Sequence, residues 1–368
     1  MNKEQLNLRV SQIAKLMLWL VLFNVFYFRV YAQNFPLVTQ QKISVSSSAE
    51  LVAAINGANK YGHIEITLQN GRYQLTTTLH ILKPYISLVS VDRNPSTTQI
   101  VGIGMHKTTS TDNIIRVAAP YFMLDGITVE QSPNHLIQIA GESNADFPIL
   151  RNCILKDGYE QLVKVSYNHN TGVASDGGLV ENCHFEYSAG IGPQYYIGGI
   201  DAHGSQDWVI KNNSFSGIAS PENKIAEHAI HFWSGTQNIT VTDNTIYNCD
   251  RGIGFGMPNR PNFGGIIANN LIVHNDNDHS NADTGIILEE SKGTHISGNR
   301  IYLAHNYPNA IEYRFAQSSN ILIENNRTNK RISKRNGAQA ILEDNILTTD
   351  INQILSAEEQ LQFGFSIK

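Results

Sequence analysis

The chain has 368 residues and a formal net charge of -5, and 41% of its residues are hydrophobic but only 16% are charged. The hydrophobic content excludes a disordered chain, and the weak negative charge without a long basic run excludes electrostatic binding of nucleic acid. Asparagine is more frequent than lysine and arginine together, which, with 28 glycines and abundant isoleucine, indicates many short strands joined by tight turns.

Residues 1–32 have the order of regions that is typical of a secretory signal peptide. Basic residues precede an apolar run over 16–28, and Val30 and Ala32 place small side chains before a cleavage position at Gln33. The run is short for a membrane span, although an uncleaved anchor is the alternative. We therefore expect a secreted or periplasmic protein that has no integral membrane span after cleavage.

Residues 33–62 are predicted to form an N-terminal segment that contains one short helix over about 48–59. Ser47 and Glu50 have the spacing of a capping box, and apolar residues recur at helical spacing behind them. The alternating residues 64–68 then predict the first strand of a longer domain.

From about residue 120 the sequence repeats a six-residue pattern with apolar residues at both ends and asparagines in the middle. The fourth position of the pattern is occupied in turn by Cys153, Cys183, Asn213, Asn244, Asn270, Asn299, Asn326 and Asn345. A motif that persists while its spacing varies is typical of a solenoid with loops of different length. We therefore predict one all-β domain over 63–350, a solenoid of about ten coils whose short units bury their apolar sides by stacking.

The repeated asparagines are expected to form a structural column at a bend of the solenoid. Stacked amides can hydrogen-bond between coils, and asparagine tolerates the left-handed backbone angles of tight turns. Cys153 and Cys183 would lie in adjacent coils within disulfide reach; two buried thiols are favoured and a bridge is the alternative. The helix near 48–59 and the segment 351–368 are expected to cap the two ends, because open strand edges invite aggregation.

The asparagine column, the capping helix and the repeat resemble the right-handed parallel β-helix of the pectate-lyase-like superfamily, over residues 43 to 350. The stretches 226–233 and 250–256 also resemble a group of secreted bacterial β-helix proteins without an established activity. The resemblance implies the fold. Members of the superfamily cleave or epimerise acidic polysaccharides, but others are adhesins or tailspikes, so the resemblance alone does not choose a function. The sequence lacks the catalytic signatures of calcium-dependent pectate lyases and of polygalacturonases.

A second strand recurs about midway through each coil, and its alternation predicts which side chains face outward. The outward third position is occupied by Lys164, Asp201, His231, Gly254, Ile287 and Glu312. The outward fifth position is occupied by Ser166, His203, Trp233, Gly256, Glu289 and Arg314. The first outward position is mostly small, so we expect a groove along the solenoid axis in which a linear glycan could lie.

Five side chains in this groove are candidate catalytic residues for cleavage of a uronic acid polymer. His231 or His203 would be the base, with Asp201 orienting the ring, because a histidine titrating near neutrality suits proton transfer. Arg251 would neutralise the sugar carboxylate, and Glu227 lies one coil before it. Arg251 and Glu227 could alternatively be a purely structural ion pair.

Further residues of the same face are candidates for substrate binding. They are Trp233, His228, Glu289, Glu312, Arg314 and Lys164. The outward Trp233 ring would stack on a sugar, unless the register slips by one and places it in the core. Tyr195 and Tyr196 precede this region and either wall the groove or pack their own loop.

The sequence indicates no cofactor with certainty, but calcium is a possible one. Calcium prefers several oxygen ligands, which Asp201, Glu227 and Asp250 could supply from neighbouring coils. Zinc at His203, His228 and His231 is less favoured, because His228 has the parity of an inward residue. The acidic run at 276–278 does not match a calcium loop and is interpreted as a solvated turn.

The favoured function is a secreted lyase that acts by β-elimination on an acidic polysaccharide. A glycoside hydrolase would instead need two carboxylates that flank the scissile bond, for which Asp201, Glu227 and Asp250 are candidates. An epimerase and a non-catalytic glycan-binding or surface protein are further alternatives on the same scaffold. The expected partner is a polysaccharide, and the protein is expected to be a monomer that does not bind nucleic acid.

Overall fold

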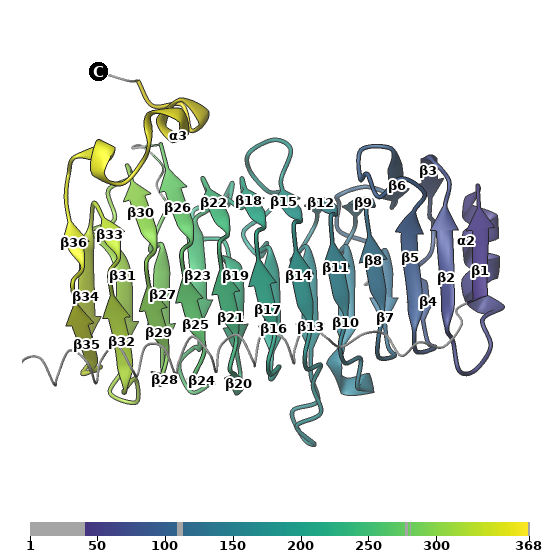
Figure 1. Ribbon diagram of the computed structural model, residues 1–368, viewed down its shortest axis with the longest axis horizontal. Coiled ribbons are helices and arrows are strands. Elements are labelled where there is room, and N and C mark those ends of the chain that lie inside the picture. Colours follow the sequence, from purple (N-terminus) through teal and green to yellow (C-terminus); the bar gives the residue numbers. More distant parts are fainter. Residues whose placement is uncertain (1–40, 109–112, 277–278, 280, 367–368) are drawn as a thin grey trace, which may run out of the picture. The chain divides into compact units, whose positions relative to one another are not determined.

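The computed structural model describes residues 41–108, 113–276, 279 and 281–366 (Figure 1). The predicted signal peptide, with its alternative as a membrane anchor, lies outside the described residues, as does most of the acidic run at 276–278. Within the described part of the chain, no helix combines the length and the apolar character needed to cross a membrane.

Three long parallel sheets, here called A, B and C, form a solenoid, and the chain visits them in that order in each complete coil (Figure 1). The first coil supplies a strand to sheet A alone, the last supplies none to sheet C, and sheet C contains 10 strands. Because a complete coil adds only one strand to each sheet, no coil can bury its apolar side alone. The predicted all-β parallel β-helix is therefore confirmed for the described residues.

Sheet A has 12 strands, which precede the bend that carries the asparagine column. They are β1 (Gln41–Val45), β2 (Ile64–Leu68), β5 (Ile86–Ser90), β8 (Met123–Asp125), β11 (Ile149–Arg151), β14 (Leu179–Glu181), β17 (Val209–Lys211), β21 (Thr240–Thr242), β25 (Ile266–Ala268), β29 (His295–Ser297), β32 (Ile321–Glu324) and β35 (Ala340–Glu343). Strand β1 extends this sheet into the segment that the sequence had assigned to an N-terminal region before the solenoid.

Sheet B has 11 strands, which follow that bend. They are β3 (Gly71–Gln74), β6 (Thr98–Val101), β9 (Thr128–Ser132), β12 (Ile154–Gly158), β15 (His184–Glu186), β18 (Ser214–Ser216), β22 (Thr245–Tyr247), β26 (Leu271–His274), β30 (Arg300–Leu303), β33 (Arg327–Thr328) and β36 (Ile346–Leu347).

Sheet C is formed by the second strand that the repeat alignment identified. Its strands are β4 (Leu79–Ile81), β7 (Ile115–Val117), β10 (Ile137–Ala140), β13 (Val163–Ser166), β16 (Ile200–His203), β19 (His228–Trp233), β23 (Arg251–Phe255), β27 (Ile286–Glu289), β31 (Asn309–Arg314) and β34 (Arg331–Arg335). Inward residues such as Ile230, Phe232 and Phe255 are fully buried in the main apolar core. A short sheet of β20 (Thr236–Gln237), β24 (Asn262–Phe263) and β28 (Ser291–Lys292) lies in the connections that leave sheet C.

The asparagine column is a continuous hydrogen-bonded ladder at the bend between sheets A and B. The Nδ2 group of Asn244 donates to the Oδ1 atom of Asn270 at 3.0 Å and to the Ile210 carbonyl at 2.9 Å. The backbone N–H of Asn244 donates to the same Oδ1 atom at 3.0 Å. The pattern repeats from Asn213 to Asn345, so these buried amides are satisfied by their neighbours.

The left-handed backbone angles of this bend belong to the residue before each ladder position. Asn182, Asn212, Asn269 and Asn325 each have a φ between 53° and 56°. The prediction that one column serves both purposes was therefore incomplete: the third residue of the motif turns the chain, and the fourth bonds the coils together. Cys153 and Cys183, at the two ladder positions that precede Asn213, are free and buried, as favoured from the sequence.

Helix α2 (Ser48–Asn56) follows β1, and its Leu51 and Ile55 side chains are buried in the main core. The side chain of Ser47 caps its start, and the helix ends three residues earlier than predicted, before Gly57. Its role as a cap of the solenoid stays a prediction.

After the last coil, the chain forms the 3₁₀ turn η2 (Ile351–Gln353) and helix α3 (Ala357–Gln362) (Figure 1). This segment packs against sheet B, where Phe363 belongs to a buried apolar cluster with Leu271 and Val273. A second 3₁₀ turn, η1 (Gly141–Ser143), follows β10.

Candidate active site on sheet C

The pairing of sheet C places the outward residues in the columns that the repeat alignment predicted. Asp201 is paired with Lys164 on one side and with His231 on the other, and His231 is paired with Gly254. His203 likewise lies beside Trp233. Parallel strands without a register shift keep equivalent positions of successive coils about 4.8 Å apart, so these side chains form one patch.

Asp201 is the buried centre of this patch. Its Oδ1 atom accepts a hydrogen bond from Trp233 Nε1 at 2.6 Å, and its Oδ2 atom accepts one from the Lys164 ammonium and lies 3.5 Å from His203 Nε2. Burial alone would raise the pKa of the Asp201 carboxyl, but the His203 ring and the Lys164 charge hold this pKa well below its usual range. Asp201 is therefore an anion that orients its neighbours.

His203 is less available as a base than the sequence suggested. Its Nε2 atom lies 3.0 Å from Lys164 Nζ. An ammonium group can only donate a hydrogen bond, so the lone pair of Nε2 must be the acceptor in this contact. Burial lowers the pKa of His203, against the opposing effect of the Asp201 carboxylate. A ring whose lone pair is already shared with an ammonium group is poorly placed to accept a proton from a substrate.

His231 is held in one orientation with one free nitrogen. Its Nε2 atom donates to the carbonyl oxygen of Gly256 at 3.1 Å, so in the neutral ring the lone pair is on Nδ1. Nδ1 lies 3.5 Å from Glu227 Oε2 and 4.0 Å from Asp201 Oδ1, and it has no hydrogen-bond partner among the described residues. Of the two predicted bases, the geometry favours His231.

Glu227 links the histidines to Arg251. Its Oε2 atom lies 3.6 Å from the Arg251 guanidinium and 3.8 Å from His228 Nδ1. Burial would raise the pKa of Glu227, but the adjacent rings of His228 and His231 and the Arg251 charge keep this pKa well below its usual range. Arg251 is fixed in turn by a hydrogen bond from its Nε atom to the Ala226 carbonyl at 2.9 Å.

His228 reaches the outward patch, contrary to the parity argument from the sequence. It has the parity of the inward Ile230, but it is the first residue of β19, and its ring lies 4.3 Å from that of His231. The space it occupies is above Gly254, where a Cβ atom would lie 2.7 Å from His228 Nε2. Burial, reinforced by the charge of Arg251, lowers the pKa of His228 well below its ordinary value, so the ring is neutral.

Trp233 faces outward, as the favoured alignment predicted, but neighbouring groups surround its ring. The Arg260 guanidinium lies over the ring at 4.8 Å, and the His203 and His231 rings contact it with centroid distances of 4.2 and 5.4 Å. Arg260 comes from a connection outside the repeat and was not foreseen. Stacking of Trp233 on a sugar stays a prediction, and it would require Arg260 to share or leave the ring.

The predicted binding residues further along the sheet form two separate networks. Arg314 donates to Glu289 at 2.8 Å, and burial raises the pKa of Glu289 against the effect of this arginine. The Glu312 side chain is 0% exposed and accepts hydrogen bonds from Tyr307, Asn309 and Arg335 at 2.6, 2.6 and 2.8 Å. Glu312 is therefore an internal anion in this structure rather than an accessible subsite.

The structure does not bring the three proposed calcium ligands together. Asp250 Oδ2 accepts backbone hydrogen bonds from Ala226 at 2.8 Å and Ser220 at 3.1 Å, whereas Glu227 contacts the histidines. The metal-ligand atoms that do lie within 4.8 Å of one another, among the residues described, belong to Glu227, His228 and His231. Calcium at Asp201, Glu227 and Asp250 stays a prediction without a preformed cluster.

Tyr195 and Tyr196 belong to the loop that precedes β16. Lys224 lies over the Tyr195 ring at 4.2 Å. Burial raises the pKa of Tyr196 to about 12, and the negative charges of Asp201 and Glu227 add to this effect. The Tyr196 hydroxyl therefore keeps its proton at neutral pH.

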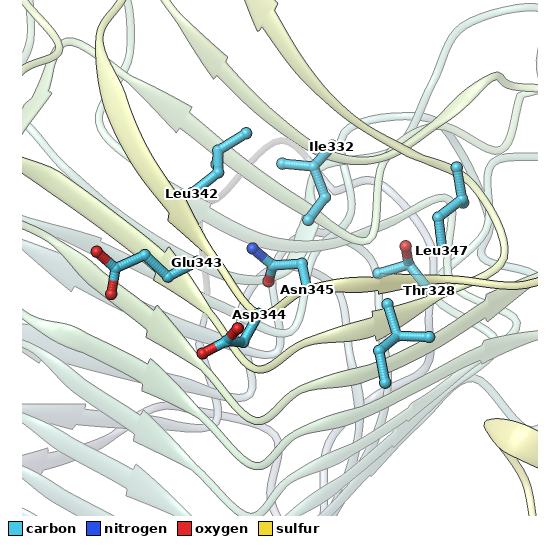
Figure 2. Close-up of a pocket in the computed structure, with 8 residues that line it drawn as sticks. Thr328, Ile332, Leu342, Glu343, Asp344, Asn345 and Leu347 are labelled. Atoms are coloured by element: carbon cyan, nitrogen blue, oxygen red, sulfur yellow. The ribbon is translucent and has the colours of Figure 1, made fainter. Parts of the chain in front are cut away.

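A hollow of about 310 Å³ lies elsewhere, in the last coil of the solenoid (Figure 2). It is lined by Thr328, Ile332, Leu342, Glu343, Asp344, Asn345, Ile346 and Leu347. Leu342 and Leu347 are exposed, and the hollow contains no buried base or cation. Its carboxylates, Glu343 and Asp344, are exposed, so the hollow lacks the buried titratable groups of the sheet C patch.

No protein-family model matches the sequence, and no curated protein matches it either. The fold is similar to that of an alginate lyase from Paenibacillus sp., with a TM-score of 0.56 and 14% identity over 84% of this chain and 99% of that chain. It is also similar to the catalytic domain of a GH87 α-1,3-glucanase, with a TM-score of 0.52 and 12% identity over 83% of this chain and 57% of that chain.

A tailspike protein of an E. coli bacteriophage, solved with a pentasaccharide, has a TM-score of 0.50 and 13% identity over 84% of this chain and 63% of that chain. At these identities the similarities show a shared fold, consistent with the pectate-lyase-like β-helix that the sequence resembles. They carry over no site residue.

Proposed function

We propose that this protein is an exported lyase that cleaves an acidic polysaccharide by β-elimination on the outward face of sheet C. The observation that carries the proposal is the free Nδ1 atom of His231, in a ring that is held through its Nε2 atom by the Gly256 carbonyl. The structural neighbours add support, because an alginate lyase and a pentasaccharide-binding tailspike share the fold. Fold alone does not decide the activity.

The reaction can be written with the residues of the patch. The uronate carboxylate lies against Arg251, whose charge stabilises the negative charge that develops when the adjacent C5–H bond is broken. His231 Nδ1 accepts the C5 proton, the C4–C5 double bond forms, and the C4–oxygen bond breaks. The hydroxyl of Tyr196 donates a proton to the departing oxygen, and Glu227 and Asp201 stabilise the imidazolium. No step requires a metal or another cofactor.

A glycoside hydrolase is the second candidate, favoured by one observation. Burial raises the pKa of Asp283 and of Glu289, whereas the pKa of Glu227 is held low. Carboxyl groups whose environments separate their pKa values are the pattern of a general acid and an ionised partner.

One experiment separates these functions. The mature protein is incubated with alginate, pectin, glycosaminoglycans and neutral glycans, and ultraviolet absorbance of unsaturated ends is followed beside reducing ends. A lyase produces both signals in equal amounts, and a hydrolase produces reducing ends alone. Binding to a glycan of this panel without either product would overturn the proposal in favour of a glycan-binding protein. An epimerase would be detected by a separate assay of proton exchange at the sugar.

A further inference from the structure

Two buried histidines of the patch have ring nitrogens without a hydrogen-bond partner. His228 is 2% exposed and His231 is 4% exposed. Both ring nitrogens of His228 and the Nδ1 atom of His231 are unpartnered within the described part of the chain. Leaving a buried polar atom without a partner costs about 1–3 kcal/mol, so three such atoms in one place point to a ligand that would satisfy them.

The positions of the three nearest donor atoms match the ligand set of one metal ion. Glu227 Oε2 lies 3.5 Å from His231 Nδ1 and 3.8 Å from His228 Nδ1. Two atoms that are each about 2.1 Å from a tetrahedral zinc ion lie about 3.4 Å apart. The cluster therefore needs shifts of a few tenths of an ångström between these pairs to coordinate such an ion.

The surroundings orient the His231 ring as histidine rings are oriented in metal centres. A metal-bound histidine usually donates its second ring N–H to a carbonyl or carboxylate, which fixes the tautomer. His231 does this through Nε2 and the Gly256 carbonyl at 3.1 Å, and its free Nδ1 atom faces Glu227. Gly254 leaves room for the His228 ring, since a Cβ atom there would lie 2.7 Å from Nε2.

We propose that Glu227, His228 and His231 form a binding site for a divalent transition-metal ion, with Zn²⁺ as the ion that fits this ligand set. Two histidines and one carboxylate are a ligand set that zinc accepts with an open fourth position. The site differs from the zinc site considered from the sequence, because Glu227 replaces His203, whose nitrogen contacts Lys164.

The competing cation at this cluster is Arg251. Its guanidinium lies 3.6 Å from the same oxygen of Glu227, which is longer than a hydrogen bond, and its Nε atom is already bonded to the Ala226 carbonyl. Arg251 therefore leaves the coordination positions of Glu227 open in this structure and would remain beside the ion as a spectator.

The inference stands on geometry and does not require the proposed lyase activity. Where both hold, they are linked, because the Nδ1 lone pair of His231 cannot bind Zn²⁺ and accept a substrate proton at the same time. The zinc-loaded protein is then expected to be inactive and the metal-free protein active.

The test is calorimetric titration of the purified full-length protein, stripped with a chelator, with Zn²⁺ alone. We expect one site, and a loss of affinity of more than about 100-fold in Glu227→Gln, since losing even an outer partner of a metal ligand costs about 10–100-fold. The matched control is Glu324→Gln, because Glu324 also contacts a histidine, His295 at 2.9 Å, but has no second one within reach. Equal affinity in the wild type and Glu227→Gln, or the absence of binding, would overturn the site.

A second variant keeps the test independent of changes to the ligands. Gly254→Ala should displace the His228 ring and weaken Zn²⁺ binding, while circular dichroism shows an unchanged β-sheet content. Cobalt substitution adds a direct readout, because four-coordinate Co²⁺ gives intense visible bands that Gly254→Ala and Glu227→Gln should lose. If turnover proves to need Zn²⁺ while Glu227→Gln loses the metal, the site is upheld and the assignment of His231 as base is wrong.

Discussion

The asparagine ladder and the histidine patch are two stacks of buried polar side chains on the same solenoid. They differ in whether the polar atoms of the stack have hydrogen-bond partners. In the ladder, Asn244 and Asn270 have their amide groups satisfied by the next coil or by a backbone carbonyl. In the patch, His228 and His231 together leave three ring nitrogens without partners. A column whose polar atoms hydrogen-bond one another stabilises the fold. A column with unpartnered polar atoms lowers the stability of the fold, and those atoms are available to a ligand.

The difference follows from how each column is built. The ladder repeats one residue in one conformation, so each coil offers the next the donor and acceptor it needs. In the patch, each coil contributes a different residue type, from Lys164 through Asp201 and His231 to Gly254. Charged groups, aromatic rings and a residue without a side chain therefore lie side by side. Stacking therefore gives stability where the sequence repeats and a site where it does not.

The strongest way to break this comparison is to replace His231 with glutamine. We expect turnover of the cleaved glycan to fall by about 100-fold to 10,000-fold, because a general base is lost. The free energy of unfolding should change little, since the Nδ1 atom makes no hydrogen bond in the folded protein and the glutamine amide can donate to the Gly256 carbonyl in place of Nε2. Initial rates and urea unfolding of the same preparations measure both quantities.

The control for His231 is His184→Gln, which changes an outward histidine of sheet B that contacts Glu186 at 3.1 Å. It should leave both turnover and unfolding as they are in the wild type. Full activity of His231→Gln would remove His231 from the mechanism and with it the contrast between patch and ladder.

The converse variant is Asn270→Ala, which should reduce stability and leave turnover of the folded protein unchanged. Three buried groups lose a hydrogen bond: the backbone N–H of Asn244, its Nδ2 group, which keeps only the Ile210 carbonyl, and the Val241 carbonyl. At about 1–3 kcal/mol for each buried group left without a partner, the free energy of unfolding should fall by about 2 kcal/mol or more. Urea denaturation followed by tryptophan fluorescence measures the loss.

Asn269→Gly is the matched control for the ladder, because Asn269 is the adjacent residue with a φ of 56° and glycine adopts this conformation freely. We expect a change below about 1 kcal/mol. If the two variants were equally mild, the ladder would owe its stability to the turn and not to its hydrogen bonds.

The sequence was sufficient for the ladder and for the register of sheet C, because both are repeats. The positions of Asp201 beside His231 and of His203 beside Trp233 followed from aligning one coil with the next. The alternation of inward and outward side chains along a strand predicted the wrong side for His228. The alternation fails there because His228 is the first residue of β19, where the chain enters the sheet.

Contacts made by residues outside the repeat could not be predicted at all. Arg260 reaches the Trp233 ring from an irregular connection, and Tyr307 reaches Glu312 from the loop before its strand. Neither has an equivalent in other coils that an alignment could use. The same limit applies to the burial of Glu312, which depends on three partners that no column places beside it.

A smaller effect is expected from Arg251→Lys, which sharpens the division of roles inside the patch. Lysine keeps the charge but loses the planar donors and the bond from Nε to the Ala226 carbonyl. We expect KM to rise by about tenfold, with a smaller change in kcat, because the sugar carboxylate is held less well. Arg116→Lys, outward in the same sheet near the N-terminal end, should have a lesser effect. An equal rise in KM would mean that the sheet as a whole, and not the patch, binds the charge.

The smallest expected effect is a difference between the histidine patch and the asparagine ladder in how the free energy of unfolding depends on pH. His228 is neutral when folded because its pKa lies well below that of the unfolded chain, so the unfolded state takes up a proton first as the pH falls. Stability from this residue is therefore complete above the unfolded pKa of about 6.5 and is lost below it, by about 0.7 kcal/mol between pH 7 and pH 6.

Amides of the ladder do not titrate, so the unfolding difference between wild type and Asn270→Ala should be the same at both pH values. The difference between wild type and His228→Asn should instead shift by that amount, with the variant losing less stability at pH 6, when both are measured in a chelator. A constant difference in both cases would mean that the pKa of His228 is the same in the folded and unfolded states, and would contradict the buried neutral ring.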